Sequence, residues 1–208
     1  MDKETAIETA LIVAFFTAIL FLGPATASEH RLRHDYPVGY GASDAYQHQT
    51  RAQAVYDMGQ YRKEAPYMMA GFKDIIGFYP PIIYHATALL ARTSGLPAHD
   101  ALFLIVGLAL ALGAVIAYYF TRPLGKAVAV LALPLTLFIT TGAPFLGAAT
   151  FGQMPFALSS LFLIATAWAI TKLSLPQGYL LAASALGGSV MTHTAQALFF
   201  SMFLGAFF

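Results

Sequence analysis

The sequence of 208 residues has no cysteine, a single tryptophan and few charged side chains. Without cysteine the chain can form no disulfide and offers no thiolate to a metal ion. Charged residues make up 10% and hydrophobic residues 58%, whereas a typical soluble domain has about 25% charged residues. The mean hydropathy of +0.66 therefore indicates an integral membrane protein. A net charge of +1, without a run of Lys or Arg, gives no sign of a nucleic-acid partner.

The charged residues that are present gather in one segment. Of the 21 Asp, Glu, Lys and Arg residues, 14 lie between Ser28 and Asp100, together with five of the six histidines. No Asp, Glu, Lys or Arg follows Lys172. This distribution indicates one long polar segment inserted near the start of a membrane chain.

Apolar runs long enough to approach the thickness of a bilayer predict the membrane spans. The first span is expected at about 6–25, and the others at about 101–120, 127–141, 156–170, 179–193 and 197–208. Ala25-Thr26-Ala27 is typical of a signal-peptide cleavage site, but the acidic start of the first run favours a helix that is retained. The sequence thus predicts an all-α, polytopic bundle of five or six transmembrane helices, forming a single membrane domain over 1–208.

The segment at about 28–98 is expected to be a large outer loop with amphipathic interfacial helices. The apolar run Pro81–Ala91 within it is too short to cross the membrane and follows two prolines. With Lys3 in the cytoplasm, the short loops that carry Arg122, Lys126 and Lys172 are also cytoplasmic, as the positive-inside rule requires. The large loop is then extracytoplasmic.

A helix is predicted within "GASDAYQHQTRAQAVYDMGQY", residues 41–61, with Ser43 as its N-cap. Asp44 then lies in the first turn, where the helix dipole favours a carboxylate. Asp44, Gln47, His48 and Arg51 share one face at helical spacing, and the opposite side is more apolar. We expect this helix to lie on the membrane surface or under other helices.

Asp44 has two interpretations. It is either an acid that helps to begin the helix or the acid of a functional site, in which His48, one turn later, orients it or shares a metal ion with it. Two such ligands are too few to predict a metal site, and "SEHRLRHD", with His30, His34 and Asp35, lacks the tight spacing of one. A divalent metal ion is nevertheless the one cofactor that these residues leave open.

A second cluster lies in "FYPPIIYHATALLARTSGL", residues 78–96. Tyr79 and Tyr84 are typical of aromatic side chains at a membrane interface, and His85 and Arg92 lie two turns apart on one helix face. The segment is either an interfacial helix with polar tips that reach the headgroups or a wall of a lipid-phosphate site. Basic side chains are the usual phosphate partners, and the candidates here are Arg62, Lys63, Lys73 and Arg92.

His193 and Gln196 lie one turn apart near the outer end of the fifth predicted span, where ionisable residues are functional candidates. With the two clusters above, they complete an ordered pattern. The order is "SDAYQHQTRAQAVYDMGQY", then "YPPIIYHATALLARTSGLPAHDALFLIVGLALAL", then "YYFTRPLGKAVAVLALPL". Over about residues 1–200 this pattern resembles the N-terminal part of the C-type (GT-C) integral-membrane glycosyltransferases, particularly prokaryotic members.

The resemblance implies transfer of a sugar from a polyprenyl-phosphate donor on the outer face. Asp44 matches the position of the family's catalytic base or metal-site acid, and His48 accompanies it. The residues expected to bind substrate are Lys73, Tyr79, His85, Arg92, Gln153 and His193. The implied partners are the lipid-linked sugar donor and membrane lipids.

The chain also departs from the family pattern. Many members carry a second acid in the second outer loop, but Thr140–Pro155 has no Asp or Glu and its most polar candidate is Gln153. The alternative prediction is therefore a non-catalytic GT-C-like subunit that binds other membrane protein subunits. A transporter is disfavoured because no charged residue lies between Lys126 and Lys172, whereas transporters usually carry ionisable groups near mid-membrane.

Overall fold

The computed structural model describes residues 3–32, 44–60, 79–141, 151–172 and 174–207, and these ranges are almost entirely helical. The elements are α1 (Lys3–Leu32), α2 (Asp44–Met58), α3 (Ile82–Ser94), α4 (Ala98–Thr121), the 3-10 turn η2 (Arg122–Leu124), α5 (Lys126–Thr141), α7 (Met154–Ile170), α8 (Pro176–Val190) and α9 (Thr194–Phe207). No strand occurs in these ranges, so the prediction of an all-α chain is confirmed. The predicted runs 6–25, 101–120, 127–141 and 156–170 each lie within one helix, as does the described part of 197–208. Helix α8 ends three residues before the predicted end of 179–193.

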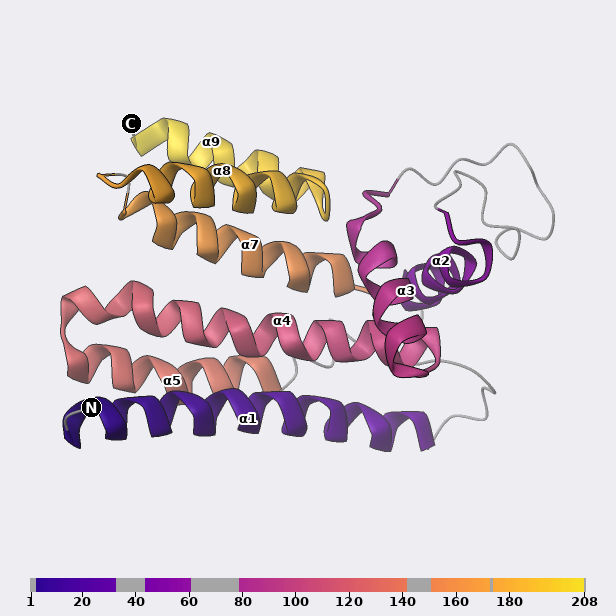
Figure 1. The fold of residues 1–208 in the computed structure, drawn as a ribbon, viewed down its shortest axis with the longest axis horizontal. Helices are drawn as coiled ribbons and strands as arrows, with labels where there is room; N and C mark the ends of the chain where they lie inside the picture. The colour runs from indigo at the N-terminus through magenta and orange to yellow at the C-terminus, as the bar shows by residue number, and fades with distance from the viewer. Residues whose placement is uncertain (1–2, 33–43, 61–78, 142–150, 173, 208) are drawn as a thin grey trace.

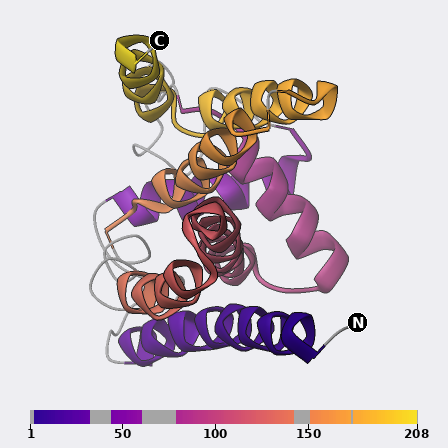
Figure 2. The ribbon, with the colours of Figure 1, turned by 90° about the vertical axis from the view of Figure 1, so that its left-hand side faces the viewer.

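Helices α1, α4, α5, α7, α8 and α9 run side by side along the long axis of the molecule (Figure 1). Helix α4 lies among them and packs against α1, α5 and α7, while α8 joins α7 to α9 (Figure 2). Helices α2 and α3 lie at one end of this bundle (Figure 1). The two therefore form a separate layer over the end of an apolar bundle.

The main core cluster lies where this layer meets the bundle. Small and β-branched side chains of α2, among them Ala45, Ala52 and Val55, pack there against Tyr84 of α3 and Met154 of α7. All five side chains are at most 3% exposed. Small residues allow α2 to approach closely, and this packing fixes the layer on the bundle.

Local signals explain several helix boundaries. Pro81 directly precedes α3, and proline is well suited to a helix start because its φ is already fixed. Gly95 ends α3 in the left-handed conformation with φ 74°, and its N–H donates to the Ala91 carbonyl at 2.9 Å. The short helix predicted for this apolar run is present, and glycine ends it.

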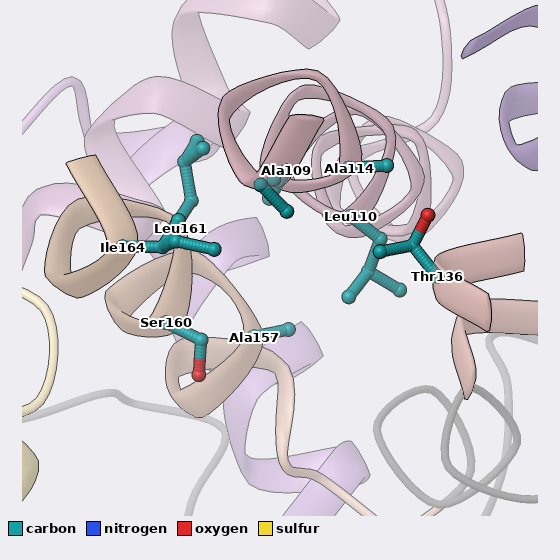
Figure 3. Close-up of a pocket in the computed structure, with 10 residues that line it drawn as sticks. Ala109, Leu110, Ala114, Thr136, Ala157, Ser160, Leu161 and Ile164 are labelled. Carbon is teal, nitrogen blue, oxygen red and sulfur yellow. The ribbon is translucent and has the colours of Figure 1, made fainter. Parts of the chain in front are cut away.

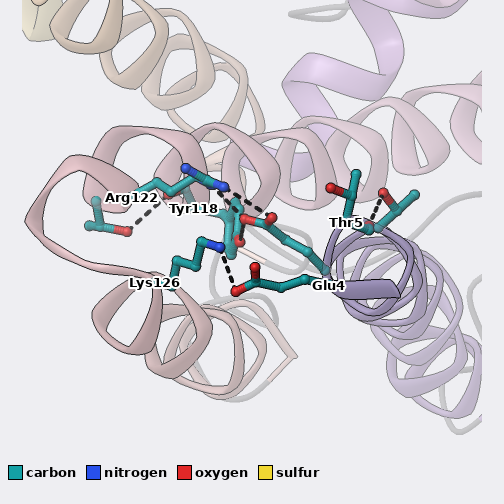
Figure 4. Close-up of polar contacts among 8 residues, drawn as sticks. Glu4, Thr5, Tyr118, Arg122 and Lys126 are labelled. Carbon is teal, nitrogen blue, oxygen red and sulfur yellow. Dashed lines mark hydrogen bonds and ion pairs between the residues drawn. The ribbon is translucent and has the colours of Figure 1, made fainter. Parts of the chain in front are cut away.

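The end of the bundle opposite α2 and α3 carries ion pairs (Figure 4). Arg122 donates two hydrogen bonds to the Glu8 carboxylate, at 2.5 and 3.1 Å, and the Tyr118 hydroxyl donates to the same carboxylate. Lys126 pairs with Glu4 at 2.5 Å. These contacts join the first turns of α1 to the turn between α4 and α5, and so set the register of the three helices.

Two helical segments, Lys3–Leu22 and Ala98–Leu124, are long and apolar enough to cross a membrane. They differ in position, because 50% of the second segment's most apolar window is buried inside the protein but only 6% of the first. Helix α4 is thus a core element, whereas α1 lies on the flank. Three further apolar helical segments are shorter, namely Lys126–Thr136, Met154–Ile170 and Thr194–Ala206. Length and composition therefore support two of the predicted five or six spans.

Candidate functional site

His48 is the centre of the polar contacts between α2 and α3. Its side chain is 2% exposed, and its Nδ1 shares a hydrogen bond of 2.7 Å with the hydroxyl of Tyr84, which is fully buried on α3. The Tyr79 ring meets the imidazole edge-on at 4.8 Å between centroids. These contacts fix the orientation of the imidazole.

The same surroundings keep His48 uncharged at neutral pH. Burial and then the positive charge of Arg51 lower the pKa of His48 to about 4, although a hydrogen bond with the Gly152 backbone opposes this change. An uncharged imidazole is both donor and acceptor, so it can hydrogen-bond to Tyr84 and to Gly152. In this arrangement His48 positions its neighbours and carries no charge.

Arg51 lies one turn after His48 and is also buried, with 7% of its side chain exposed. Its guanidinium carbon lies 5.5 Å from the centroid of the Tyr79 ring, within the range of a cation–π contact. Its Nη1 atom is buried and has no hydrogen-bond partner among the described residues. A buried cation is thus held mainly by an aromatic ring.

Asp44 and Tyr79 lie at the edge of this cluster. Burial raises the pKa of Tyr79, the negative charge of Asp44 raises it further, and the charge of Arg51 opposes both. Asp44 is the first residue of α2 and is exposed to solvent. An accessible carboxylate therefore stands next to a cluster of partly or fully buried aromatic and basic side chains.

His193 approaches the cluster from the turn between α8 and α9. Its ring centroid lies 6.1 Å from that of Tyr79 and 6.0 Å from that of Phe156 on α7. Its Nδ1 accepts a hydrogen bond from the Gln196 N–H at 3.2 Å, which caps the start of α9. We call His48, Arg51, Tyr79, Tyr84 and His193 the junction cluster.

The segment before α7 packs closely against the start of α2. Gly152 has φ +87°, and a Cβ atom placed on it would lie 2.4 Å from backbone atoms of Asp44 and Ala45. Glycine is therefore required both by the backbone conformation and by the close approach. Gln153, the next residue, is exposed, and its carbonyl accepts the Ala157 N–H at 3.0 Å.

The structure brings together only part of the set of residues predicted to form a site. Asp44, His48, Tyr79 and His193 gather at the junction cluster, and Gln153 lies beside it. Lys73, a predicted phosphate partner with Arg62 and Lys63, lies outside the described residues. The predicted N-cap, Ser43, also lies outside them, although α2 begins at Asp44 as expected.

Arg92 contacts Tyr56 and does not lie beside Asp44. Its Nη2 donates to the Tyr56 carbonyl near the C-terminal end of α2, and its guanidinium lies over the Tyr56 ring at 5.6 Å. Tyr56 is twelve residues after Asp44, a distance of about 18 Å along a helix. Arg92 therefore ties the ends of α2 and α3 together, away from Asp44. His85 is exposed on α3, next to the buried Tyr84 in sequence.

One expectation about α2 is wrong. The face that holds His48 and Arg51 was expected to be the polar side of an amphipathic helix, yet both residues are buried together with Ala45 and Ala52. The reason is that α3 and the segment before α7 cover this face. Sequence reasoning gave Arg51 no role in a site and treated Tyr84 only as an interfacial ring. The i, i+3 spacing of His48 and Arg51 was the available signal.

An apolar cavity of about 250 Å³ lies between α4, α5 and α7 (Figure 3). Ten residues line it, most of them alanine, leucine, isoleucine or glycine, and the hydroxyls of Thr136 and Ser160 are its polar groups. Ala157 lines this cavity and also belongs to the core cluster beneath α2. The cavity thus begins next to the junction, but the described residues that line it carry no group that could carry out acid–base chemistry.

Within the described ranges, no three His, Asp or Glu side chains gather in an arrangement that could hold a metal ion. Comparison of the chain with protein-family models, with curated proteins and with solved structures finds no match.

Proposed function

We propose that this chain is a GT-C-like glycosyltransferase module of a membrane, which transfers a sugar from a polyprenyl-phosphate donor on the outer face. The observation that carries this proposal is the position of Asp44. It is an exposed carboxylate beside a cluster of basic and aromatic side chains, at the end of an apolar helical bundle. A lipid-linked substrate needs such a place, where an apolar chain and a polar headgroup are held at neighbouring sites.

The proposed arrangement has α1, α4, α5, α7, α8 and α9 in the membrane. The flanks of the bundle expose large apolar side chains, for example Phe21 at 69%, Leu131 at 70% and Leu180 at 71%. Exposed apolar surface of this extent is expected in contact with lipid rather than with water. The four shorter helices have 14 to 17 residues, or about 21 to 26 Å of length. They approach the hydrocarbon thickness of about 30 Å with their flanking turns.

The distribution of charge supports an orientation. The start of α1, the turn between α4 and α5, and the turn between α7 and α8 lie at the end of the bundle away from α2 and α3 (Figure 1). These places carry Lys3, Arg122, Lys126 and Lys172. The positive-inside rule places this end in the cytoplasm and the junction cluster outside.

In the proposed reaction the Asp44 carboxylate accepts the proton of an acceptor hydroxyl. The acceptor oxygen then bonds to the anomeric carbon of the sugar, and the bond from that carbon to the phosphate oxygen breaks. Polyprenyl phosphate leaves with the electron pair, and cationic groups stabilise its developing charge. His48 has a positioning role in this proposal, because its uncharged ring is held by Tyr84. The apolar cavity next to the junction offers space for part of the lipid chain.

The alternative is a non-catalytic GT-C-like subunit of a membrane complex. One observation favours it: Arg92 lies at the far end of α2 rather than beside Asp44. In this case the acid would only begin the helix, where the dipole stabilises it by about 0.3–1 kcal/mol.

Substitution of Asp44 distinguishes the catalytic function from the non-catalytic one. Asp44→Asn keeps the size and hydrogen-bonding ability of the side chain but removes the base. Asp57→Asn is the matched control, since Asp57 is another exposed acid on α2 and accepts a hydrogen bond from Gln53, at 2.8 Å. Transfer of radiolabelled sugar from a polyprenyl-phosphate donor should be lost in Asp44→Asn and kept in Asp57→Asn, with both variants produced at wild-type levels. Equal transfer by the two variants would exclude Asp44 as the base.

A further inference from the structure

Arg51 is a buried cation whose counter-charge is absent from the described residues. The ion pairs there join Arg122 and Lys126 to Glu8 and Glu4 at the other end of the bundle, and His99 to Asp100 at the start of α4. Asp57 lies further along α2 and accepts a hydrogen bond from Gln53. In the described ranges none of these carboxylates forms an ion pair with Arg51.

Asp44 is the acid of α2 that shares a helix face with Arg51. It precedes Arg51 by seven residues, about 10 Å along the helix axis, and it is exposed, whereas Arg51 is 93% buried. Both charges act on Tyr79, but no ion pair links them. Asp44 therefore offsets the charge of Arg51 only weakly, because the two groups are far apart and solvent screens the Asp44 carboxylate.

Burial of a guanidinium without a paired anion is unfavourable, because the lost hydration is not replaced. The Tyr79 ring, 5.5 Å away, replaces part of it through a cation–π contact. Among the described residues, the buried Nη1 of Arg51 has no acceptor. The guanidinium presents its N–H donors in a planar fork that fits two oxygens of one oxyanion.

We infer that Arg51 is the central donor of a binding site for a phosphate group, formed at the junction of α2, α3 and the turn before α9. Tyr79 and His193, whose rings lie 6.1 Å apart, form its rim on the side of the bundle. A phosphate group is chosen because, in the proposed membrane arrangement, this junction lies at the level of the lipid headgroups. The inference rests on that arrangement and not on the transfer reaction.

Tyr79 is suited to this rim. Burial and the charge of Asp44 raise its pKa, so its hydroxyl remains protonated at neutral pH and can donate to an anion. His48 lies behind it, kept uncharged by burial and by the charge of Arg51, which lower its pKa, and hydrogen-bonded to Tyr84. Arg51 is therefore the one side chain of the junction cluster with a permanent positive charge, and the anion's affinity should depend chiefly on it.

The test uses the full chain in phosphatidylcholine nanodiscs, with polyprenyl monophosphate and inorganic phosphate as separate probes. Binding is measured from the rise of the thermal unfolding midpoint with probe concentration. We expect Arg51→Gln to bind about 10- to 100-fold more weakly than the wild type, the loss typical of a charge-assisted hydrogen bond. Lys172→Gln, which removes an exposed cation at the other end of the bundle, should bind as the wild type does.

Without any probe, Arg51→Gln should unfold at the wild-type temperature or above it, because it removes an uncompensated buried charge. A merely structural arginine would instead lower that temperature. If Arg51→Gln does not fold, Arg51→Lys keeps the charge without the fork and should show intermediate affinity. Binding of the lipid monophosphate alone would identify a headgroup site, and equal dependence of inorganic phosphate binding on Arg51 would identify a site for free phosphate.

The inference is overturned if the wild type binds neither probe, or if Arg51→Gln binds as tightly as the wild type. A chain that binds a phosphate through Arg51 but transfers no sugar would refute the proposed reaction and leave this site standing. If Arg51→Gln transfers sugar as fast as the wild type, the phosphate site at Arg51 is refuted and the proposed reaction stands.

Discussion

Gly152 offers a sharp test of how the start of α2 is held. The residue has φ +87°, and an added Cβ would lie 2.4 to 2.5 Å from backbone and Cβ atoms of Asp44 and Ala45. Real Cβ atoms do not approach other atoms so closely, and the atoms in the way belong mostly to the backbone. Gly152→Ala must therefore push α2 and the segment before α7 apart.

The expected loss of stability in Gly152→Ala has two parts. Any non-glycine residue at this φ costs about 1–2 kcal/mol in backbone strain, and the forced overpacking costs about 1–3 kcal/mol more. Gly95→Ala is the matched control, because Gly95 has φ +74° and nothing within 4 Å of its added Cβ. It should show only the strain. The free energies of unfolding of the two variants should thus differ by about 1–3 kcal/mol.

The assay is unfolding of the full chain in mixed micelles by added SDS, followed by the helical circular dichroism signal. We expect the order of stability to be wild type, then Gly95→Ala, then Gly152→Ala. Equal stability of the two alanine variants would show that the segment before α7 does not lie against Asp44. The position of the proposed base would then have to be abandoned.

Two further predictions concern His48 and the orientation in the membrane. The pKa of His48 is about 4 when folded and 6.5 in the unfolded chain, so the unfolded state binds more protons between these pH values, and stability should fall as the pH is lowered through them. The loss is at most about 3 kcal/mol and should be absent in His48→Gln; an identical pH profile of unfolding in that variant would contradict this origin. For the orientation, the chain has no cysteine, so single-cysteine variants can be labelled cleanly. In intact cells an impermeant maleimide should react with Asp57→Cys but not with Gln177→Cys, and the opposite result would reverse the proposed topology.

The sequence was sufficient for the secondary structure because apolar runs and helix stop signals are local. Helix α2 has Asp44 in its first turn, as predicted, and Gly95 ends α3. Residue spacing also identified His48 and Arg51 as members of one face. Spacing does not reveal which face another segment will cover, and for this reason both residues were expected on the polar side although they are buried.

The partners of individual side chains were less predictable, because they depend on contacts between segments far apart in the chain. Arg92 was expected to face a phosphate, but it donates to the Tyr56 carbonyl, 36 positions earlier. The requirement for glycine at 152 arises from the approach of α2, more than 100 residues away, and no local pattern signals it. Tyr84 likewise gains its importance from its hydrogen bond with His48.

The most direct test of the central claim is the ratio of sugar-transfer rates between the wild type and Asp44→Asn, measured with a polyprenyl-phosphate donor and with Asp57→Asn as the reference. Loss of a general base lowers a rate by about 100- to 10,000-fold, and the account predicts a fall in this range for Asp44→Asn alone. A wild-type chain that transfers sugar at the rate of Asp44→Asn would contradict it.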